Sequence, residues 1–299
     1  MKYISREFPN TRLRRIRMKS FSRKMVSENS LSSNDLIWPV FLSNGNKSRD
    51  EISSMPGIYR YSIDILLKEL DLLVEQGLNA IALFPTIKSE LKDERGSYAY
   101  DSKNFIFKAV KKIKKEFPKL GIICDVALDP YTNHGHDGII INGKVDNDKT
   151  LENLINQSLN LAEAGCDIVA PSDMMDGRVG VIRSSFENNG FNDVMIMSYA
   201  AKYSSSLYGP FRDAVNAGKL TEPRNKKSYQ MDYANSNEAM HEISMDIAEG
   251  ADMIMIKPGL PYLDIITKSK QLFSMPTFAY QVSGEYSMIM SASELNYIN

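Results

Sequence analysis

The stretch Asp252-Met-Ile-Met-Ile-Lys-Pro-Gly-Leu-Pro-Tyr-Leu-Asp264 is the most informative part of this chain. Its residues 253–257 are typical of a buried strand, because four apolar side chains precede a lysine. A lysine held against apolar surface loses the solvation of its ammonium group, so its pKa falls and neutral amine appears. Neutral amine is the nucleophile that forms Schiff bases with carbonyl compounds. Lys257 is therefore a candidate catalytic residue.

A second lysine follows another apolar run. Lys202 comes shortly after Val194-Met-Ile-Met-Ser-Tyr199, and a nearby cation would lower the pKa of Lys257 further. Either lysine alone is more simply a strand-end residue whose ammonium reaches water. Two lysines at the carboxyl ends of two parallel strands favour chemistry, because barrel enzymes place their active sites at that rim.

Short apolar runs alternate with helical patterns along the chain. The runs are apolar throughout, as in parallel strands that are covered on both faces. We expect strands at 36–42, 79–85, 121–128, 167–173, 194–199, 253–257 and 277–282. We expect helices at 62–76, 105–117, 151–164, 177–189, 235–249 and 261–272. This strand–helix repetition predicts an α/β fold, a TIM (β/α)8-type barrel with about seven β/α units.

Capping residues mark the starts of two of these helices. Thr150 is expected to be the N-cap of the helix from 151. Asn235, with Glu238 three residues later, resembles a capping box. After residue 282 only 17 residues remain (283–299), which suffice for a loop and part of a helix.

Composition excludes several classes of protein. The chain has 299 residues, 43% of them hydrophobic and 24% charged, with a net charge of −1, so a globular protein without a nucleic-acid partner is expected. No apolar run approaches the length of a membrane span. Two cysteines in predicted core segments favour a reducing, cytoplasmic setting. A basic arm, residues 1–30, precedes a barrel domain at 31–299. The arm lacks the apolar core of a secretory signal, and an organelle transit peptide stays open.

Carboxylates and histidines gather after the third predicted strand. Asp125 lies inside that apolar strand, which is costly unless the carboxylate has a partner. The loop that follows contains Asp129, His134, His136 and Asp137. They are consistent with an acid/base or metal cluster, and equally with ordinary turn residues.

Polar residues also follow the neighbouring strands. Asp173, at the end of the fourth strand, is a catalytic candidate, and Ser172 precedes it. Arg212 and Lys226 are candidate carboxylate binders, although a surface role is about as consistent with their spacing. The long insertions 128–148 and 218–234 are expected to be lids or binding loops, or to be disordered. These patterns indicate a Schiff-base enzyme acting on a carbonyl compound. The same patterns are also consistent with a different lysine Schiff-base enzyme, such as a class I aldolase.

Three motifs carry a resemblance to a known family. They are Ala170-Pro-Ser-Asp-Met-Met-Asp-Gly-Arg178, Tyr208-Gly-Pro-Phe-Arg-Asp213 and Met255-Ile-Lys-Pro-Gly259. Together they resemble porphobilinogen synthase (5-aminolevulinate dehydratase), and the similarity covers nearly the whole chain. The resemblance implies a lyase of tetrapyrrole (haem) biosynthesis that condenses two 5-aminolevulinate molecules to porphobilinogen, without an organic cofactor.

The resemblance also implies roles for particular residues. Lys257 would form the Schiff base with the substrate that becomes the propionate side, and Lys202 would engage the substrate of the acetate side. Asp125 and Asp173 would assist proton transfers. The expected substrate-binding residues are Ser172, Phe211, Arg212, Lys226, Gln230, Tyr280 and Ser283.

Metal use is the next implication of the resemblance. Zinc-dependent members carry cysteines where this chain has Ala127, Asp129 and Asp137, and thiolate is the ligand that favours zinc. The resemblance therefore predicts Mg²⁺ or a monovalent cation, with Asp129 and Asp137 as candidate ligands, instead of zinc. Glu242 aligns with the ligand of the family's allosteric magnesium site.

Assembly is the last implication. The arm, through 12–23, resembles the segment that embraces a neighbouring subunit in the family's homo-octamers and hexamers. The family continues into an eighth strand and a final helix, and the resemblance predicts that both are missing here. An incomplete barrel leaves an alternative open, a non-catalytic relative that acts as a subunit of an oligomer.

Overall fold

The computed structural model describes residues 7–217, 220–221 and 223–299. The chain divides into two compact units, Met1–Leu36 and Ile37–Asn299. The first unit contains three short helical segments: η1 (Leu13–Arg17), α1 (Ser20–Met25) and η2 (Ser33–Asp35). No helix among the described residues is both long and apolar enough to cross a membrane.

The second unit is built on a nine-stranded sheet in the order β11-β10-β9-β8-β5-β4-β1-β3-β2. Each neighbouring pair is parallel except the last, β3 with β2. The seven strands from β11 to β1 correspond to the seven predicted strands. Their bounds are β1 (Trp38–Ser43), β4 (Ala80–Thr86), β5 (Gly121–Val126), β8 (Ile168–Pro171), β9 (Met195–Lys202), β10 (Met253–Lys257) and β11 (Thr277–Ala279).

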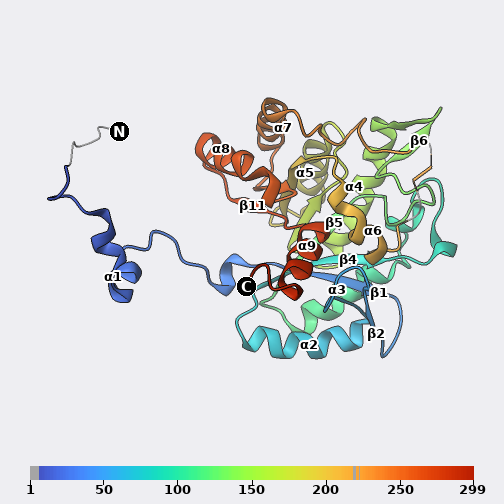
Figure 1. The fold of residues 1–299 in the computed structure, drawn as a ribbon. Helices are drawn as coiled ribbons and strands as arrows, with labels where there is room; N and C mark the ends of the chain where they lie inside the picture. The colour runs from blue at the N-terminus through green and yellow to red at the C-terminus, as the bar shows by residue number, and fades with distance from the viewer. Residues whose placement is uncertain (1–6, 218–219, 222) are drawn as a thin grey trace. The chain divides into compact units, whose positions relative to one another are not determined.

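Helices flank the strands and follow them along the chain (Figure 1). Each predicted helix is present within a few residues of its expected bounds. The six are α2 (Ile63–Glu75), α3 (Phe105–Glu116), α4 (Asn147–Glu163), α5 (Arg178–Asn189), α7 (Ser236–Ala248) and α8 (Leu263–Phe273). They form because apolar residues recur on one face; in α2 the buried face consists of Leu66, Leu67 and Leu70.

The sheet is curved like a barrel wall. The ring centroids of Phe84 on β4 and Tyr280, just after β11, lie 6.0 Å apart. Strands about 4.8 Å apart in a flat sheet would separate these two positions by roughly 24 Å, since five strand steps lie between them. The sheet therefore bends back on itself, as the barrel prediction requires. No ladder joins β11 to β1 among the described residues.

A helix not foreseen in full connects the two ends of this curved sheet. Helix α9 (Ser283–Glu294) follows β11 almost directly, whereas the sequence indicated a loop and only part of a helix. The hydroxyl of Tyr286 donates to the Pro56 carbonyl at 2.5 Å, and that of Ser287 donates to the Ser54 carbonyl at 2.7 Å. Both carbonyls belong to the loop between β2 (Arg49–Glu51) and β3 (Tyr59–Tyr61). Helix α9 thus bridges the β11 side of the sheet to the β1 side.

Other elements lie inside the predicted insertions and loops. The insertion at 128–148 contains a two-stranded hairpin, and a short helix precedes the second insertion. These additional elements are β6 (Ile139–Ile141), β7 (Lys144–Asp146), α6 (Gly209–Ala214), η3 (Ser89–Leu91), η4 (Ser97–Ala99), η5 (Ser206–Tyr208) and η6 (Leu260–Tyr262).

Two capping predictions were wrong in detail. Helix α4 is capped by Asp146, whose carboxylate accepts the N–H of Lys149 at 2.9 Å. Thr150 lies inside the first turn, where its hydroxyl donates to the Asp146 carbonyl. Asn235 occupies the N-cap position of α7 as expected, but its side chain accepts no N–H of the helix, so no capping box forms. Its side-chain amide donates to the Glu238 carboxylate instead.

Candidate active site

Two neighbouring strands place the two predicted lysines side by side. Lys257 ends β10 and Lys202 ends β9, and the two residues are register partners in the parallel ladder. Each of the two residues is only 5% exposed. Strand β9 extends three residues beyond its predicted end, and this extension brings Lys202 into the strand.

Aromatic rings surround the amine of Lys257. Its Nζ lies 4.5 Å from the ring centroid of Tyr280, 5.0 Å from those of Tyr199 and Phe211, and 5.4 Å from that of Tyr208. Burial, followed by repulsion from Lys202, lowers the pKa of Lys257 to about 7. Near neutral pH the amine is therefore partly neutral, as Schiff-base chemistry requires.

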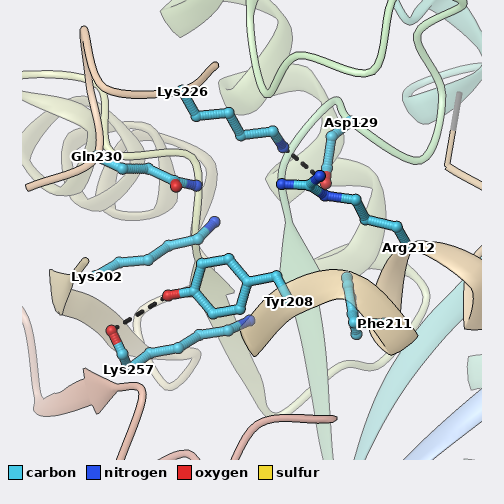
Figure 2. A pocket seen from close by; sticks show the side chains of 8 residues that line it. All are labelled: Asp129, Lys202, Tyr208, Phe211, Arg212, Lys226, Gln230 and Lys257. Carbon is cyan, nitrogen blue, oxygen red and sulfur yellow. Dashed lines mark hydrogen bonds and ion pairs between the residues drawn. The ribbon is translucent and has the colours of Figure 1, made fainter. Parts of the chain in front are cut away.

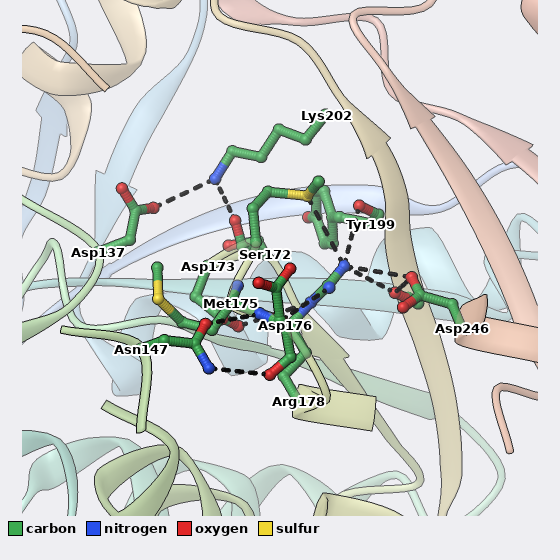
Figure 3. Close-up of polar contacts among 12 residues, drawn as sticks. Asp137, Asn147, Ser172, Asp173, Met175, Asp176, Arg178, Tyr199, Lys202 and Asp246 are labelled. Atoms are coloured by element: carbon green, nitrogen blue, oxygen red, sulfur yellow. Dashed lines mark hydrogen bonds and ion pairs between the residues drawn. The ribbon is translucent and has the colours of Figure 1, made fainter. Parts of the chain in front are cut away.

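Lys202 has different surroundings. Its Nζ lies 3.2 Å from the Asp137 carboxylate and donates to the Ser172 carbonyl (Figure 3). Burial alone would raise the pKa of Asp137, but the nearby ammonium groups of Lys202 and Lys226 lower it overall. Asp137 therefore stays a carboxylate and holds Lys202 in an ion pair.

The described part of the second insertion covers these groups with further polar side chains. Lys226 Nζ lies 2.6 Å from Asp137 and 3.2 Å from Asp129. Gln230 follows in the same turn, with its N–H bonded to the Lys226 carbonyl at 2.9 Å. Residues 218, 219 and 222 of the predicted lid at 218–234 lie outside the described residues.

These side chains converge on one pocket. Figure 2 shows the amine ends of the lysines, the guanidinium of Arg212 and the ring of Phe211 around it. Apart from Tyr208, each lining residue was a sequence prediction. The lining residues are Asp129, Lys202, Tyr208, Phe211, Arg212, Lys226, Gln230 and Lys257.

Two predicted serines support the pocket from behind. The hydroxyl of Ser283, at the start of α9, accepts the N–H of Phe211 at 2.9 Å. Ser172 contributes its carbonyl to Lys202. Both serines are buried, so they hold pocket residues in place in this structure.

The two predicted proton-transfer residues are both carboxyl groups with raised pKa values. Burial raises the pKa of Asp125 on β5 to about 6, against the opposing charges of Lys257 and Lys202. Burial raises the pKa of Asp173 to about 7. Groups with pKa values near neutrality can both take up and release protons.

Asp173 belongs to a buried network and not to the pocket lining among the described residues. Its Oδ1 accepts the N–H of Met175 at 2.8 Å, and its Oδ2, which has no hydrogen-bond partner, lies 3.9 Å from Arg178 Nε. Arg178 also pairs with Asp246 at 3.2 Å (Figure 3). A second carboxylate, that of Glu242, lies 3.1 Å from Arg178. A buried guanidinium with several carboxylates is compensated, whereas either charge alone would be costly.

The predicted metal ligands do not form a preformed metal centre. No group of three or more His, Cys, Asp or Glu side chains suitable for a metal ion occurs among the residues that the structure describes. The carboxylates of Asp129 and Asp137 already pair with lysine ammonium groups, so in this arrangement they fit a metal ion poorly. Glu242 lies apart from them, beside Arg178, and burial raises its pKa.

The comparisons with known proteins agree with this geometry. The family model described as "Delta-aminolevulinic acid dehydratase" matches residues 10–299. The chain belongs to the delta-aminolevulinic acid dehydratase family. Family membership makes it a lyase of the 5-aminolevulinate dehydratase type, as the sequence predicted.

Relatives from several lineages support the assignment. The delta-aminolevulinic acid dehydratase of Bradyrhizobium diazoefficiens is 54% identical over 282 residues, covering 94% of this chain and 80% of the relative. That of Methanothermus sociabilis is 53% identical, covering 98% of this chain and 90% of the relative. Because the family model matches as far as residue 299, the comparisons do not bear out the predicted loss of a final strand and helix.

A solved structure of the dehydratase family shows the same fold. The crystal structure of delta-aminolevulinic acid dehydratase from Toxoplasma gondii, in complex with the reaction product porphobilinogen, superposes with a TM-score of 0.94. It is 44% identical and covers 97% of this chain and 82% of that chain. The TIM-barrel-type fold is confirmed. The comparisons support the catalytic interpretation and not the alternative of a non-catalytic subunit. The dehydratase assignment is consistent with a metal ion but does not choose which one.

Proposed function

We propose that this chain condenses two molecules of 5-aminolevulinate to porphobilinogen with release of two water molecules, through lysine Schiff bases. One observation carries the proposal: a buried lysine amine, lowered in pKa to about 7, lies beside a second buried lysine at the strand ends of a barrel. Such a pair of amines suits a reaction that must hold two ketone substrates at once.

Lys257 acts as the nucleophile. Its neutral amine adds to the ketone carbon of the first substrate, and loss of water leaves a Schiff base with the molecule that becomes the propionate side. The aromatic rings around its Nζ keep water away and so keep the amine partly neutral. Lys202 engages the second substrate, which becomes the acetate side.

The two carboxyl groups move protons. Asp125, with a pKa of about 6, and Asp173, with a pKa of about 7, supply and remove the protons that the additions and dehydrations require. Asp125 lies closer to this role, because both lysines perturb its pKa directly.

The rest of the pocket binds the substrates. Substrate carboxylates meet Arg212, Lys226 and Gln230, since these are cationic or amide donors on the pocket lining. Phe211 and Tyr280 pack against the carbon chain. Ser172 and Ser283 complete the binding site.

Three further assignments belong to the same proposal. The chain uses Mg²⁺ in preference to zinc, because its candidate ligands are oxygen atoms. Glu242, which pairs with Arg178 in this structure, would be the residue that holds the ion, as the resemblance implies. Asp129 and Asp137 serve as lysine partners. The chain forms a homo-octamer or hexamer in the cytoplasm.

Two measurements test the proposal. The purified chain is assayed for porphobilinogen with and without added Mg²⁺, and is reduced with borohydride in the presence of 5-aminolevulinate. We expect product and a stable label on Lys257. Lys257→Ala abolishes both, and Lys111→Ala, at an exposed lysine on α3, changes neither. A wild-type chain that is neither labelled nor active would refute the proposal.

A further inference from the structure

We propose that Tyr229 and His136 form an anchor that holds the lid turn closed and thereby positions Lys226 and Gln230 over the pocket. The inference rests on the function proposed above and assigns to it two positioning residues that do not themselves touch the reacting atoms.

The hydroxyl of Tyr229 makes three polar contacts with the loop after β5. It donates to Asp137 Oδ2 at 2.9 Å, lies 3.0 Å from His136 Nδ1, and accepts the N–H of Asp137 at 3.4 Å. One oxygen atom therefore joins the turn at 226–230 to a different segment, about 90 residues earlier in the chain.

His136 holds the same segment at a second point. Its other ring nitrogen, Nε2, lies 2.8 Å from the Pro223 carbonyl, which can only accept a hydrogen bond. The imidazole is completely buried and packs edge-on against the Tyr229 ring, with centroids 6.0 Å apart. The ring of His136 therefore spans two lid positions six residues apart, and contact at two points restricts the segment more than either alone.

The anchored turn carries substrate-binding groups on both sides of Tyr229. The Lys226 carbonyl accepts the N–H groups of Tyr229 at 3.2 Å and Gln230 at 2.9 Å. A displacement of the Tyr229 side chain therefore moves Lys226 and Gln230 together. It also releases one contact to Asp137, the carboxylate that pairs with Lys202.

Tyr229 has no direct part in the chemistry that the pocket supports. The described pocket lining includes Lys226 and Gln230 but not Tyr229, and burial and the neighbouring Asp137 carboxylate raise the pKa of its phenol far above neutrality. The hydroxyl is thus a fixed hydrogen-bonding group and not a proton carrier at neutral pH. Its contribution is to hold the lid.

The decisive variant is Tyr229→Phe, which removes one oxygen and keeps the ring. We expect KM for 5-aminolevulinate to rise about tenfold, because a lost hydrogen bond to a charged group opens the lid, while kcat falls by no more than about threefold. Borohydride labelling of Lys257 at saturating 5-aminolevulinate should be unchanged. The control is Tyr131→Phe, since the buried Tyr131 hydroxyl contacts the Asn104 amide and not the lid; its KM should match wild type.

A double-mutant cycle separates a shared anchor from general loosening. His136→Ala should raise KM in the same manner, and the double variant should raise KM by less than the two single effects combined, because each single variant already loses the contact between Tyr229 and His136. His136→Gln should recover part of the loss, since its amide can still donate to Pro223.

A measurement that needs no enzymatic turnover, the rate of proteolysis, tests the anchor independently of the proposed activity. Trypsin cleavage after Lys227, an exposed residue in the anchored turn, should be several-fold faster in native Tyr229→Phe than in wild type or Tyr131→Phe. An inactive wild-type chain would refute the function and leave this test intact. Equal cleavage rates, or kinetic losses in kcat with unchanged KM, would overturn the anchor.

Discussion

Two lysines on adjacent strands have opposite electrostatic surroundings. Lys202 lies against the Asp137 carboxylate, whereas Lys257 faces aromatic rings and has no ion pair with a carboxylate of the described residues. The ring faces favour a cation, but the loss of water around the amine outweighs them and its pKa falls. Lys202 thus has an ion-pair partner in Asp137, whereas burial leaves the amine of Lys257 partly neutral. Lys257 is therefore the amine that is ready to attack a ketone.

The pH dependence of labelling tests this electrostatic pair. Only the neutral amine of Lys257 reacts, so below its pKa of about 7 the labelling rate should fall about tenfold per pH unit. Charged Lys202 lowers the pKa of Lys257, so Lys202→Met should raise that pKa and move the acid limb to higher pH. The Asp125 carboxylate raises the pKa of Lys257, so Asp125→Asn should move the limb to lower pH.

The rate of borohydride labelling of Lys257 is measured from pH 5 to 9 in wild type, Lys202→Met and Asp125→Asn. Lys111→Met is the control, and it should leave the acid limb of the profile at the wild-type pH. Shifts of the same sign in Lys202→Met and Asp125→Asn, or a profile without a limb near pH 7, would contradict the assignment.

The sequence predicted the charged part of the site better than its aromatic part. Lys257 and Lys202 were recognisable because a lysine at the end of an apolar run is unusual. Tyr199 and Tyr208 gave no such signal, because a tyrosine in an apolar segment is typical of core. The role proposed for Tyr229 depends on its contacts with His136 and Asp137, and contacts between residues so far apart in sequence leave no local pattern.

Among the elements, the helices and parallel strands were predictable from local periodicity. Strand β10 has the expected bounds, Met253–Lys257. Helix starts were less certain, since Thr150 and Asp146 are both good caps and only the fold decides which N–H groups need one. Helix α9 was underestimated, because its apolar residues give a weak pattern and its position depends on contacts with the loop at 52–58 and with α6.

The start of α9 is packed tightly enough for a single methyl group to disturb it. A Cβ at Gly284 would lie 2.6 Å from the Leu207 carbonyl oxygen, a backbone atom that cannot rotate away. Gly284→Ala should therefore displace Ser283, weaken its bond to Phe211 and lower the free energy of unfolding by about 1–3 kcal/mol. Urea unfolding and the kcat/KM for 5-aminolevulinate measure the two effects.

Gly209→Ala is the matched control, because a Cβ there meets open space and its backbone is helical. It should leave unfolding and kcat/KM close to wild type. Equal behaviour of the two alanine variants would show that the contact between α9 and η5 is unimportant.

On the scale of the whole chain, the two compact units differ in how far their apolar side chains are buried. The buried apolar clusters of the described residues draw all their members from residues 37–299. The first unit instead exposes a series of large apolar residues. They are Phe8, Leu13, Ile16, Met18, Phe21, Met25, Val26, Leu31 and Leu36. We infer that these exposed apolar residues bind another protein, and a second copy of the chain is the partner that the proposed homo-oligomer supplies.

Deletion of residues 1–36 tests that role, because the barrel keeps every member of its apolar clusters. We expect the shortened chain to retain its circular dichroism and a cooperative urea transition, but to form a smaller species than the full chain in light scattering at equal concentration. Replacing Leu13, Ile16 and Phe21 by serine in the full-length chain should have the same effect, since apolar burial is the main force in obligate interfaces. Replacing Arg14, Arg15 and Arg17 by glutamine should have less effect if apolar contacts dominate. If the shortened chain keeps the mass of the full chain, the exposed residues of the first unit do not hold the assembly together, and the interface must lie on the barrel unit.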